Sequence, residues 1–415
     1  MPFKDKRYFL LLALFLLHVF LRFYAIETKS IFQYDQVDSA WAAKQILIDH
    51  KFPLIGPENK LGSGFFVGPL YYYLISTFYY FTDMDPIAAG LFAGFTSIIG
   101  FFVLFFVTKK LFSFGMALIA VFINTISYSS IDFERVQWEV NFIPIISLLI
   151  FYFLYKILLG NEKNILYLSI VLALAFHVHL TPAVFLPAIV LFALPFFPKT
   201  RKTLLYAVFS TPILLAGLSP IIIVNLLNKS SHAVSQLQYA NSSFHGIHLT
   251  RILQLLKDAF IQIESYLLFP GIRFLSLLAL PLFFIIHFLN RPTRKNFIMS
   301  YLVFLFFVIP WIILSTYSHE ITNYYFSVSR FVGLIVISYI IFKMLELKNK
   351  IITLSILIFA LYYSAISMQK FLNKRTVGLS NYRQFVTGQI REGKVIPFEK
   401  GSPFSYIYYL YTRNK

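Results

Sequence analysis

Long apolar runs recur along almost the whole chain. Runs such as 86–107 and 140–159 have about the 20 residues that an α-helix needs to cross the hydrocarbon core of a bilayer. A water-soluble core has no room for this much apolar surface, because 58% of the 415 residues are hydrophobic and only 13% are charged. The sequence therefore predicts an all-α integral membrane protein with about eleven transmembrane helices. The predicted spans are 8–26, 86–107, 112–130, 140–159, 165–181, 182–197, 203–224, 267–289, 297–316, 331–347 and 351–368.

One further apolar run, 65–81, is ambiguous because it contains Gly68-Pro69 and three consecutive tyrosines. If it crossed the membrane, every later loop would change sides. If it lies at the interface as a juxtamembrane helix, most lysines and arginines of the short loops collect on the side of the amino terminus, which is the cytoplasmic side by the positive-inside rule. This predicts a multi-pass protein of the cell membrane, with its amino terminus in the cytoplasm and its carboxyl terminus outside. The cytoplasmic residues would include Lys4, Lys6, Arg7, Lys109, Lys110, Lys199, Arg201, Lys202, Arg294 and Lys295.

The polar segments of this topology face outward. We expect residues 1–368 to form one polytopic membrane domain, with an outer catalytic loop at 27–85, a second outer loop at 225–266 and a short outer-face tail at 369–415. No separate soluble catalytic segment is evident, so an active site would be built from helix ends and outer loops. The chain has no cysteine, which excludes thiol chemistry and disulfides. Its net charge of +18 is scattered between apolar runs, which argues against nucleic acid as a partner and for membrane lipids.

The segment directly after the first predicted span is the most informative. Asp35 and Asp38 are three residues apart in a stretch whose alanines favour a short helix, so both carboxylates would lie on one side of its first turn. One interpretation is structural: Asp35 caps the helix and Asp38 complements its dipole. The other is catalytic: one carboxylate acts as a general base on an acceptor hydroxyl while the other positions a substrate.

A second group of polar residues lies in the short outer segment 131–141. It holds three acids and one arginine, and the structural interpretation is an interfacial cluster of ion pairs with Trp138 at the membrane surface. Alternatively, Arg135 binds a phosphate, since a guanidinium pairs with phosphate oxygens in a fork.

Histidines at a predicted outer helix end are further candidates. His177 and His179 are two residues apart and point in different directions on a helix, so we do not expect them to share a metal. The spacing of His245 and His248 lacks a carboxylate partner, so no metal site is predicted there either. No cofactor is indicated, although the acidic residues are compatible with a divalent cation.

Taken in order, these segments resemble the polytopic membrane glycosyltransferases of the GT-C type, namely the protein O-mannosyltransferases and their bacterial relatives, including the lipid A aminoarabinose transferases. The first-loop aspartate of that family matches Asp35, but its usual neighbouring glutamate is Gln36 here, so the second acid is sought at Asp38. The resemblance runs from Tyr8 to about Tyr239. It is carried by 35–40, by Phe52-Pro53-Leu54-Ile55-Gly56-Pro57, by Gly68-Pro69-Leu70-Tyr71-Tyr72-Tyr73, by 135–144 and by His179.

The resemblance implies a glycosyltransferase that moves a hexosyl or pentosyl group from a polyprenyl-phosphate donor to an acceptor hydroxyl on the outer face of the membrane. The acceptor would be a glycan, a lipid or a protein. Asp35 is the predicted base, with Asp38 as the second catalytic carboxylate. A transporter or flippase of a lipid-linked glycan is the alternative, in which Asp35, Arg135 and His179 would gate the substrate. The predicted substrate contacts are Arg135, Trp138, Asn141, Lys60, His179, Arg330 and Glu134.

Overall fold

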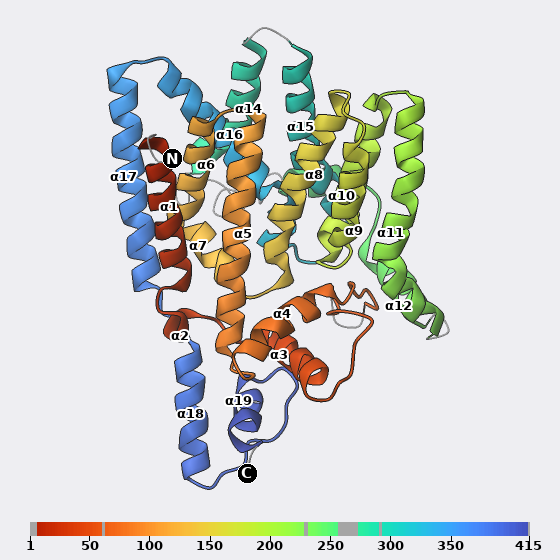
Figure 1. Cartoon of the computed structure of the whole chain (residues 1–415), viewed down its shortest axis with the longest axis vertical. Helices are drawn as coiled ribbons and strands as arrows, with labels where there is room; N and C mark the ends of the chain where they lie inside the picture. The colour runs from red at the N-terminus through yellow and green to blue at the C-terminus, as the bar shows by residue number, and fades with distance from the viewer. Residues whose placement is uncertain (1–5, 60–62, 228–230, 256–272, 290–292, 414–415) are drawn as a thin grey trace.

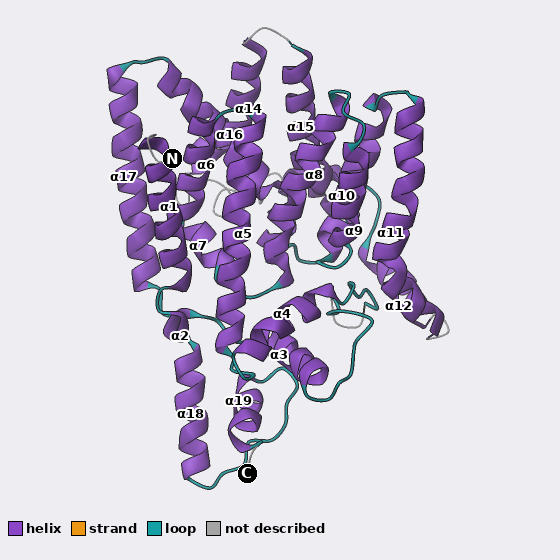
Figure 2. Ribbon diagram, in the orientation of Figure 1, coloured by secondary structure: helices purple, strands orange, loops and turns teal. Residues whose placement is uncertain are grey.

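The computed structural model describes residues 6–59, 63–227, 231–255, 273–289 and 293–413. All regular elements in these ranges are helices (Figure 2), as the apolar runs predict. Each predicted span contains an apolar helix or its described part. These helices are α1 (Lys6–Phe23), α5 (Ile87–Leu111), α6 (Phe114–Ile126), α8 (Ile143–Leu158), α9 (Asn164–Ala175), α10 (Leu180–Ala193), α11 (Arg201–Leu227), α14 (Arg273–Leu289), α15 (Arg294–Ser315), α16 (Ser327–Glu346) and α17 (Lys350–Asn373).

Length and hydropathy separate these helices into groups. Six helical stretches of the described chain are long and apolar enough to cross a membrane, and a bent pair brings the number to seven. The helices α9 and α10 and the apolar part of α14 are shorter. The chain is therefore a multi-pass membrane protein, while the number of eleven crossings stays a prediction. Most of the apolar surface of α11 and α17 is exposed in the protein, as expected of helices that face lipid.

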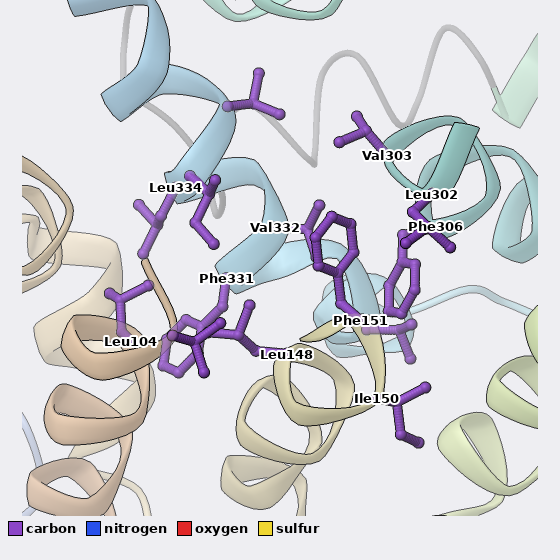
Figure 3. Close-up of a cluster of buried hydrophobic side chains, with 14 of the residues drawn as sticks. Leu104, Leu148, Ile150, Phe151, Leu302, Val303, Phe306, Phe331, Val332 and Leu334 are labelled. Carbon is purple, nitrogen blue, oxygen red and sulfur yellow. The ribbon is translucent and has the colours of Figure 1, made fainter. Parts of the chain in front are cut away.

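The core of the bundle lies where α5, α8, α15 and α16 meet (Figure 3). Phe151 of α8 packs against Phe306 of α15, with ring centres 5.3 Å apart. Phe331 and Leu334 of α16 fill the space toward Leu104 of α5. Large side chains in fixed contacts hold these helices in one arrangement, because lipid supplies no hydrophobic force between helices.

The predicted span 112–130 is not one straight helix. The helix α6 ends at Ile126, and α7 (Tyr128–Glu134) leaves it at an angle of 71°. The break frees carbonyl groups that Arg22 of α1 binds: its Nη1 donates to the oxygen of Thr125 at 2.7 Å and its Nη2 to that of Asn124 at 2.8 Å. Arg22 is also paired with Glu134 at 2.5 Å, and both side chains are buried.

Three helices lie across the lower end of the bundle instead of along it (Figure 1): α2 (Ile26–Lys29), α3 (Tyr34–Leu47) and α4 (Leu70–Phe81). The 12 residues of α4 reach about 18 Å, which is shorter than the hydrocarbon core. This length is compatible with the juxtamembrane helix that the charge distribution predicts for the run 65–81, and that placement stays a prediction. The tail helices α18 (Leu379–Arg391) and α19 (Pro403–Thr412) lie at the same end of the molecule.

The tail and the juxtamembrane helices share one apolar cluster. Val37 of α3, Tyr79 of α4, Tyr382 of α18 and Tyr406 of α19 are all buried in it. The hydroxyl of Tyr406 donates to the backbone oxygen of Met84 at 2.9 Å. The tail is therefore packed directly on the elements that carry the candidate catalytic residues.

Candidate active site

The two predicted carboxylates lie at the start of α3, but neither one caps that helix. The residue before the helix is Gln33, whose backbone N–H donates to the Gln36 side chain at 3.0 Å. Asp35 is already the second helical residue, and its carboxylate has no hydrogen bond or ion pair with the described residues. The interpretation of Asp35 as the helix cap is therefore wrong, and its side chain is available for chemistry.

Asp38, by contrast, is held by two partners. The hydroxyl of Tyr72 donates to its Oδ2 at 2.5 Å, and Nζ of Lys400 lies 3.5 Å from its Oδ1. Tyr72 comes from α4 and Lys400 from the tail, so three separate segments meet at this carboxylate. A carboxylate fixed in this way is suited to orienting a substrate or a neighbouring base.

Both aspartates line a cavity of about 250 Å³. Four carboxylates face it, those of Asp35, Asp38, Glu58 and Glu139, and Lys400 is the basic residue among its lining residues that the structure describes. The cavity is therefore rich in acidic groups, although burial raises the pKa of Glu139 to about 8, so that this carboxyl holds its proton at neutral pH. Its polar lining consists of Tyr34, Asp35, Asp38, Ser39, Glu58, Asn59, Tyr72, Trp138, Glu139, His179, Tyr324 and Lys400.

The surroundings change the proton affinity of the groups at the cavity wall. Desolvation raises the pKa of Asp35, and the nearby charge of Asp38 raises it further. Burial and then the charge of Asp38 raise the pKa of Tyr72 as well, so Tyr72 keeps its proton and remains a donor. An Asp35 with a raised pKa binds a proton more tightly than an ordinary aspartate, which suits general base catalysis.

A network of buried amides holds α3 in place beside the cavity. Nε2 of Gln36 donates to the backbone oxygen of Gln137 at 2.6 Å. Nε2 of Gln137 in turn donates to Oγ of Ser39 at 3.1 Å and to the hydroxyl of Tyr71. The network joins α3 and α4 to the segment that follows α7, so Gln36, where the family has glutamate, acts here as a structural link.

Trp138 lies in the cavity wall, and Asn141 holds it there. The indole Nε1 donates to Oδ1 of Asn141 at 2.7 Å, while Nδ2 of Asn141 donates to the backbone oxygen of Val136 at 2.6 Å. The indole ring contacts Tyr324 edge-on, with centres 5.4 Å apart. Trp138 is thus placed to contact a substrate, whereas Asn141 contacts Trp138 and not the cavity.

The two histidines have different surroundings. Gly68 packs so closely on His177 that an added Cβ would lie 1.9 Å from its Nδ1, which explains the glycine in the Gly68-Pro69 sequence. His179 is the residue before α10, and its Nδ1 accepts the backbone N–H of Thr181 at 3.1 Å. Of the two, His179 lines the cavity.

A second, apolar cavity of about 60 Å³ adjoins the first. Asn59 and His179 line both cavities, so the two are neighbours. Aromatic and aliphatic side chains line most of the second cavity, and the hydroxyls of Tyr239 and Tyr317 are 2.8 Å apart at its wall. A carboxylate-lined chamber beside an apolar chamber suits a ligand with a polar head and a hydrocarbon chain.

The other predicted contacts lie elsewhere. Glu134 is paired with Arg22, and Arg135 donates to the backbone oxygens of Leu21 and Arg22 at 2.9 and 2.8 Å. Arg330 donates to the backbone oxygen of Ser129 at 3.0 Å and lies over the ring of Phe133. None of these three lines the acidic cavity. Lys60 is outside the described residues.

Sequence reasoning missed several residues of the cavity. Glu139 and Tyr72 belong to sequences that carry the family resemblance, so their position in those motifs was an available signal. Glu58 and Asn59 follow Gly56-Pro57 and have no distinctive sequence pattern. Lys400 is brought in from the far end of the chain, which no local pattern reveals. Within the described ranges, no three His, Asp or Glu side chains are grouped as ligands of a metal ion.

No protein-family model matches the chain, and no curated protein matches it. Solved structures do. ArnT from Cupriavidus metallidurans bound to undecaprenyl phosphate superimposes with a TM-score of 0.60 at 9% identity, over 96% of this chain and 74% of that one. The archaeal oligosaccharyltransferase AglB from Archaeoglobus fulgidus, in complex with an inhibitory peptide and a dolichol-phosphate, gives 0.55 at 14% identity, over 96% of this chain and 60% of that one. The chain therefore has the GT-C membrane glycosyltransferase fold.

Proposed function

We propose that the protein transfers a sugar from a polyprenyl-phosphate-linked donor to an acceptor hydroxyl on the outer face of the membrane. The observation that carries this proposal is the carboxylate of Asp35, which pairs with no described residue, in an acidic cavity that adjoins an apolar, aromatic one. The fold agrees with it, because the two similar proteins hold undecaprenyl phosphate and a dolichol-phosphate.

Asp35 acts as the general base in the proposed reaction. It takes the proton from the acceptor hydroxyl as the acceptor oxygen forms a bond to the anomeric carbon of the sugar. The bond between that carbon and the phosphate oxygen breaks, and polyprenyl phosphate leaves with the electron pair. Asp38, fixed by Tyr72, orients the sugar or the acceptor through hydrogen bonds.

The donor would occupy both cavities. Its first prenyl units fit the apolar cavity beside Tyr239 and Tyr317, and its sugar fits the acidic cavity. His179 lines both cavities and Trp138 lines the acidic one, so both side chains would contact the sugar or the phosphate. Lys60, in the outer catalytic loop, remains a proposed contact of the donor or the acceptor.

Several predicted contacts would act indirectly. Asn141 positions Trp138 through its hydrogen bond to the indole. Glu134 and Arg330 hold α7, whose end leads into the cavity wall. The proposal that Arg135 binds the phosphate of the donor is the least supported by the geometry, because its guanidinium faces a different cavity.

An assay of sugar transfer from the lipid-linked donor tests the function. Membranes from cells that produce the protein, and from cells that do not, are incubated with an extract of polyprenyl-phosphate-linked sugars carrying a radiolabel in the sugar. Loss of label from the lipid fraction, with its appearance in a new glycan, lipid or protein, is expected only with the protein present. Movement of intact labelled lipid across the bilayer without loss of the sugar would instead support a flippase.

A further inference from the structure

A small cavity lies on the other side of the segments that carry the active site. It encloses about 20 Å³ at the junction of α1, α2, α7 and the end of α17. Three basic residues line it, Lys29, Arg135 and Lys374, and one acidic residue, Asp132. The described lining therefore has a net charge of +2, which is unusual for a cavity at the end of a membrane domain.

The positive charges of this cavity are crowded together. Burial, and then the charges of Arg135 and Lys374, lower the pKa of Lys29. Two cations lie over the ring of Phe371. Lys29 Nζ is 5.5 Å from the ring centre, and the Arg135 guanidinium is 5.3 Å from it. A cation over an aromatic ring is partly stabilised, but the ring does not neutralise its charge.

Most donors in the cavity already have protein partners. Lys29 Nζ donates to the backbone oxygens of Phe371, Leu372 and Lys374 at 3.0 to 3.1 Å, and Lys374 is paired with Asp132. The exception is Arg135. Its Nη1 donates to the backbone oxygen of Leu21 at the end of α1, but its Nη2 is buried and has no hydrogen-bond partner within the described part of the chain.

An unpaired guanidinium nitrogen on a side chain that is only 7% exposed is costly, and an oxyanion is the ligand it accepts best. The enclosed volume admits about one oxygen atom. An anion that enters would place one oxygen in this space beside the Arg135 side chain, and the rest of it would stay near Lys374 and Thr376, which also line the cavity.

The position of the cavity favours a lipid over a free ion. It lies where α1 and α17 end, and the last turns of both helices expose apolar side chains, including Phe20 of α1 and Leu372 of α17. Acyl chains along these side chains would bring a headgroup to the mouth of the cavity.

We propose that this cavity binds the phosphate group of a membrane phospholipid. Bound there, the phosphate would contact the segments of Ile31 and Val136, which lead within three residues to Tyr34 and Trp138 in the wall of the acidic cavity. The lipid would thus hold the active-site segments in place from behind. This inference does not depend on the proposed transfer reaction.

Two substitutions that break the same ion pair give a decisive test. Lys374→Gln removes a positive charge from the mouth, so it should weaken phospholipid binding about fivefold or more. Asp132→Asn removes the competing acid, so it should strengthen binding by a similar factor. If the ion pair were purely structural, both substitutions would change phospholipid binding in the same direction. Arg135 is left unchanged because it also caps α1. The matched control is Lys370→Gln, an exposed lysine of α17 outside the cavity lining.

Binding is measured on the full chain in detergent, by native mass spectrometry and by thermal shift, with phosphatidylglycerol as the probe. A galactosyl diacylglycerol with the same acyl chains serves as the phosphate-free lipid. Opposite changes in the two variants, with no change in the control, would support the proposal. Equal stabilisation by both lipids, equal changes in both variants, full competition by inorganic phosphate, or binding of undecaprenyl phosphate alone would each overturn it.

Discussion

The hydroxyl of Tyr72 donates a hydrogen bond of 2.5 Å to the carboxylate of Asp38, whereas Asp35, one turn earlier, has no such partner in the described chain. The two acids of α3 therefore differ in kind. Asp38 is fixed by a neighbour that keeps its proton, and Asp35 is open to the cavity with a raised pKa. This difference assigns positioning to Asp38 and proton transfer to Asp35.

Removing the Tyr72 hydroxyl should free the Asp38 carboxylate to move, while the ring of residue 72 still fills its place in the cavity wall. For Tyr72→Phe we expect kcat to fall about three- to tenfold, since one hydrogen bond to a charged group is lost and the ring stays in place. Thermal stability should change little. Tyr80→Phe, at an exposed tyrosine of the same helix, is the control and should leave turnover unchanged. The measurement is sugar transfer in membranes at saturating donor.

The pH dependence of transfer should report the raised pKa of Asp35. A base works when ionised, so activity falls as the pH drops through its pKa, and a raised pKa moves this acid limb to higher pH than an ordinary aspartate would give. Asp38→Asn removes the neighbouring charge and lowers the pKa of Asp35. Its acid limb should therefore move to lower pH, although the overall rate is reduced. A profile that stays in place or moves to higher pH would argue against Asp35 as the titrating base.

The buried pair of Arg22 and Glu134 should be important for stability. In Glu134→Gln the charge of Arg22 loses its counter-ion in a fully buried site, which typically costs about 3–5 kcal/mol. Glu346→Gln breaks the exposed pair with Lys343 and should cost at most about 0.5 kcal/mol. Thermal unfolding in detergent compares the two. Similar melting temperatures for both variants would contradict the role given to the buried pair.

The orientation in the membrane can be read with reporters. A reporter fused after Lys110 should lie in the cytoplasm, because α5 ends there with Lys109 and Lys110, and one fused after Lys415 should lie outside. Finding both reporters on the same side would exclude the arrangement in which the tail and the acidic cavity face outward.

Much of the fold was predictable because lipid imposes a simple rule: each crossing needs a long apolar helix. The same rule does not describe how a helix breaks. The division between α6 and α7 depends on Arg22, which is more than a hundred residues away and binds the freed carbonyls. The local sequence around the break therefore cannot predict that contact.

The candidate site was predictable in part for a similar reason. Asp35 and Asp38 lie in one short helix, and Trp138 and His179 are in segments that point to the same end of the bundle, so order along the chain was sufficient. Arg135 shows the limit. Its position next to acids in a short loop suggests a site residue, but its direction depends on the end of α1, which its guanidinium caps. Lys400 shows the opposite case, because folding of the tail brings it to Asp38.

The most direct test of the central claim is the rate of sugar transfer by Asp35→Asn, measured beside Asp38→Asn. Asn keeps the size of the side chain, and Asp35 does not cap α3, so expression and thermal stability should stay near those of the unchanged protein. If Asp35 is the base, its variant should lose about 10²- to 10⁴-fold in turnover and Asp38→Asn should lose less. Transfer by Asp35→Asn at the unchanged rate, or a larger loss in Asp38→Asn, would contradict the assignment of the base to Asp35.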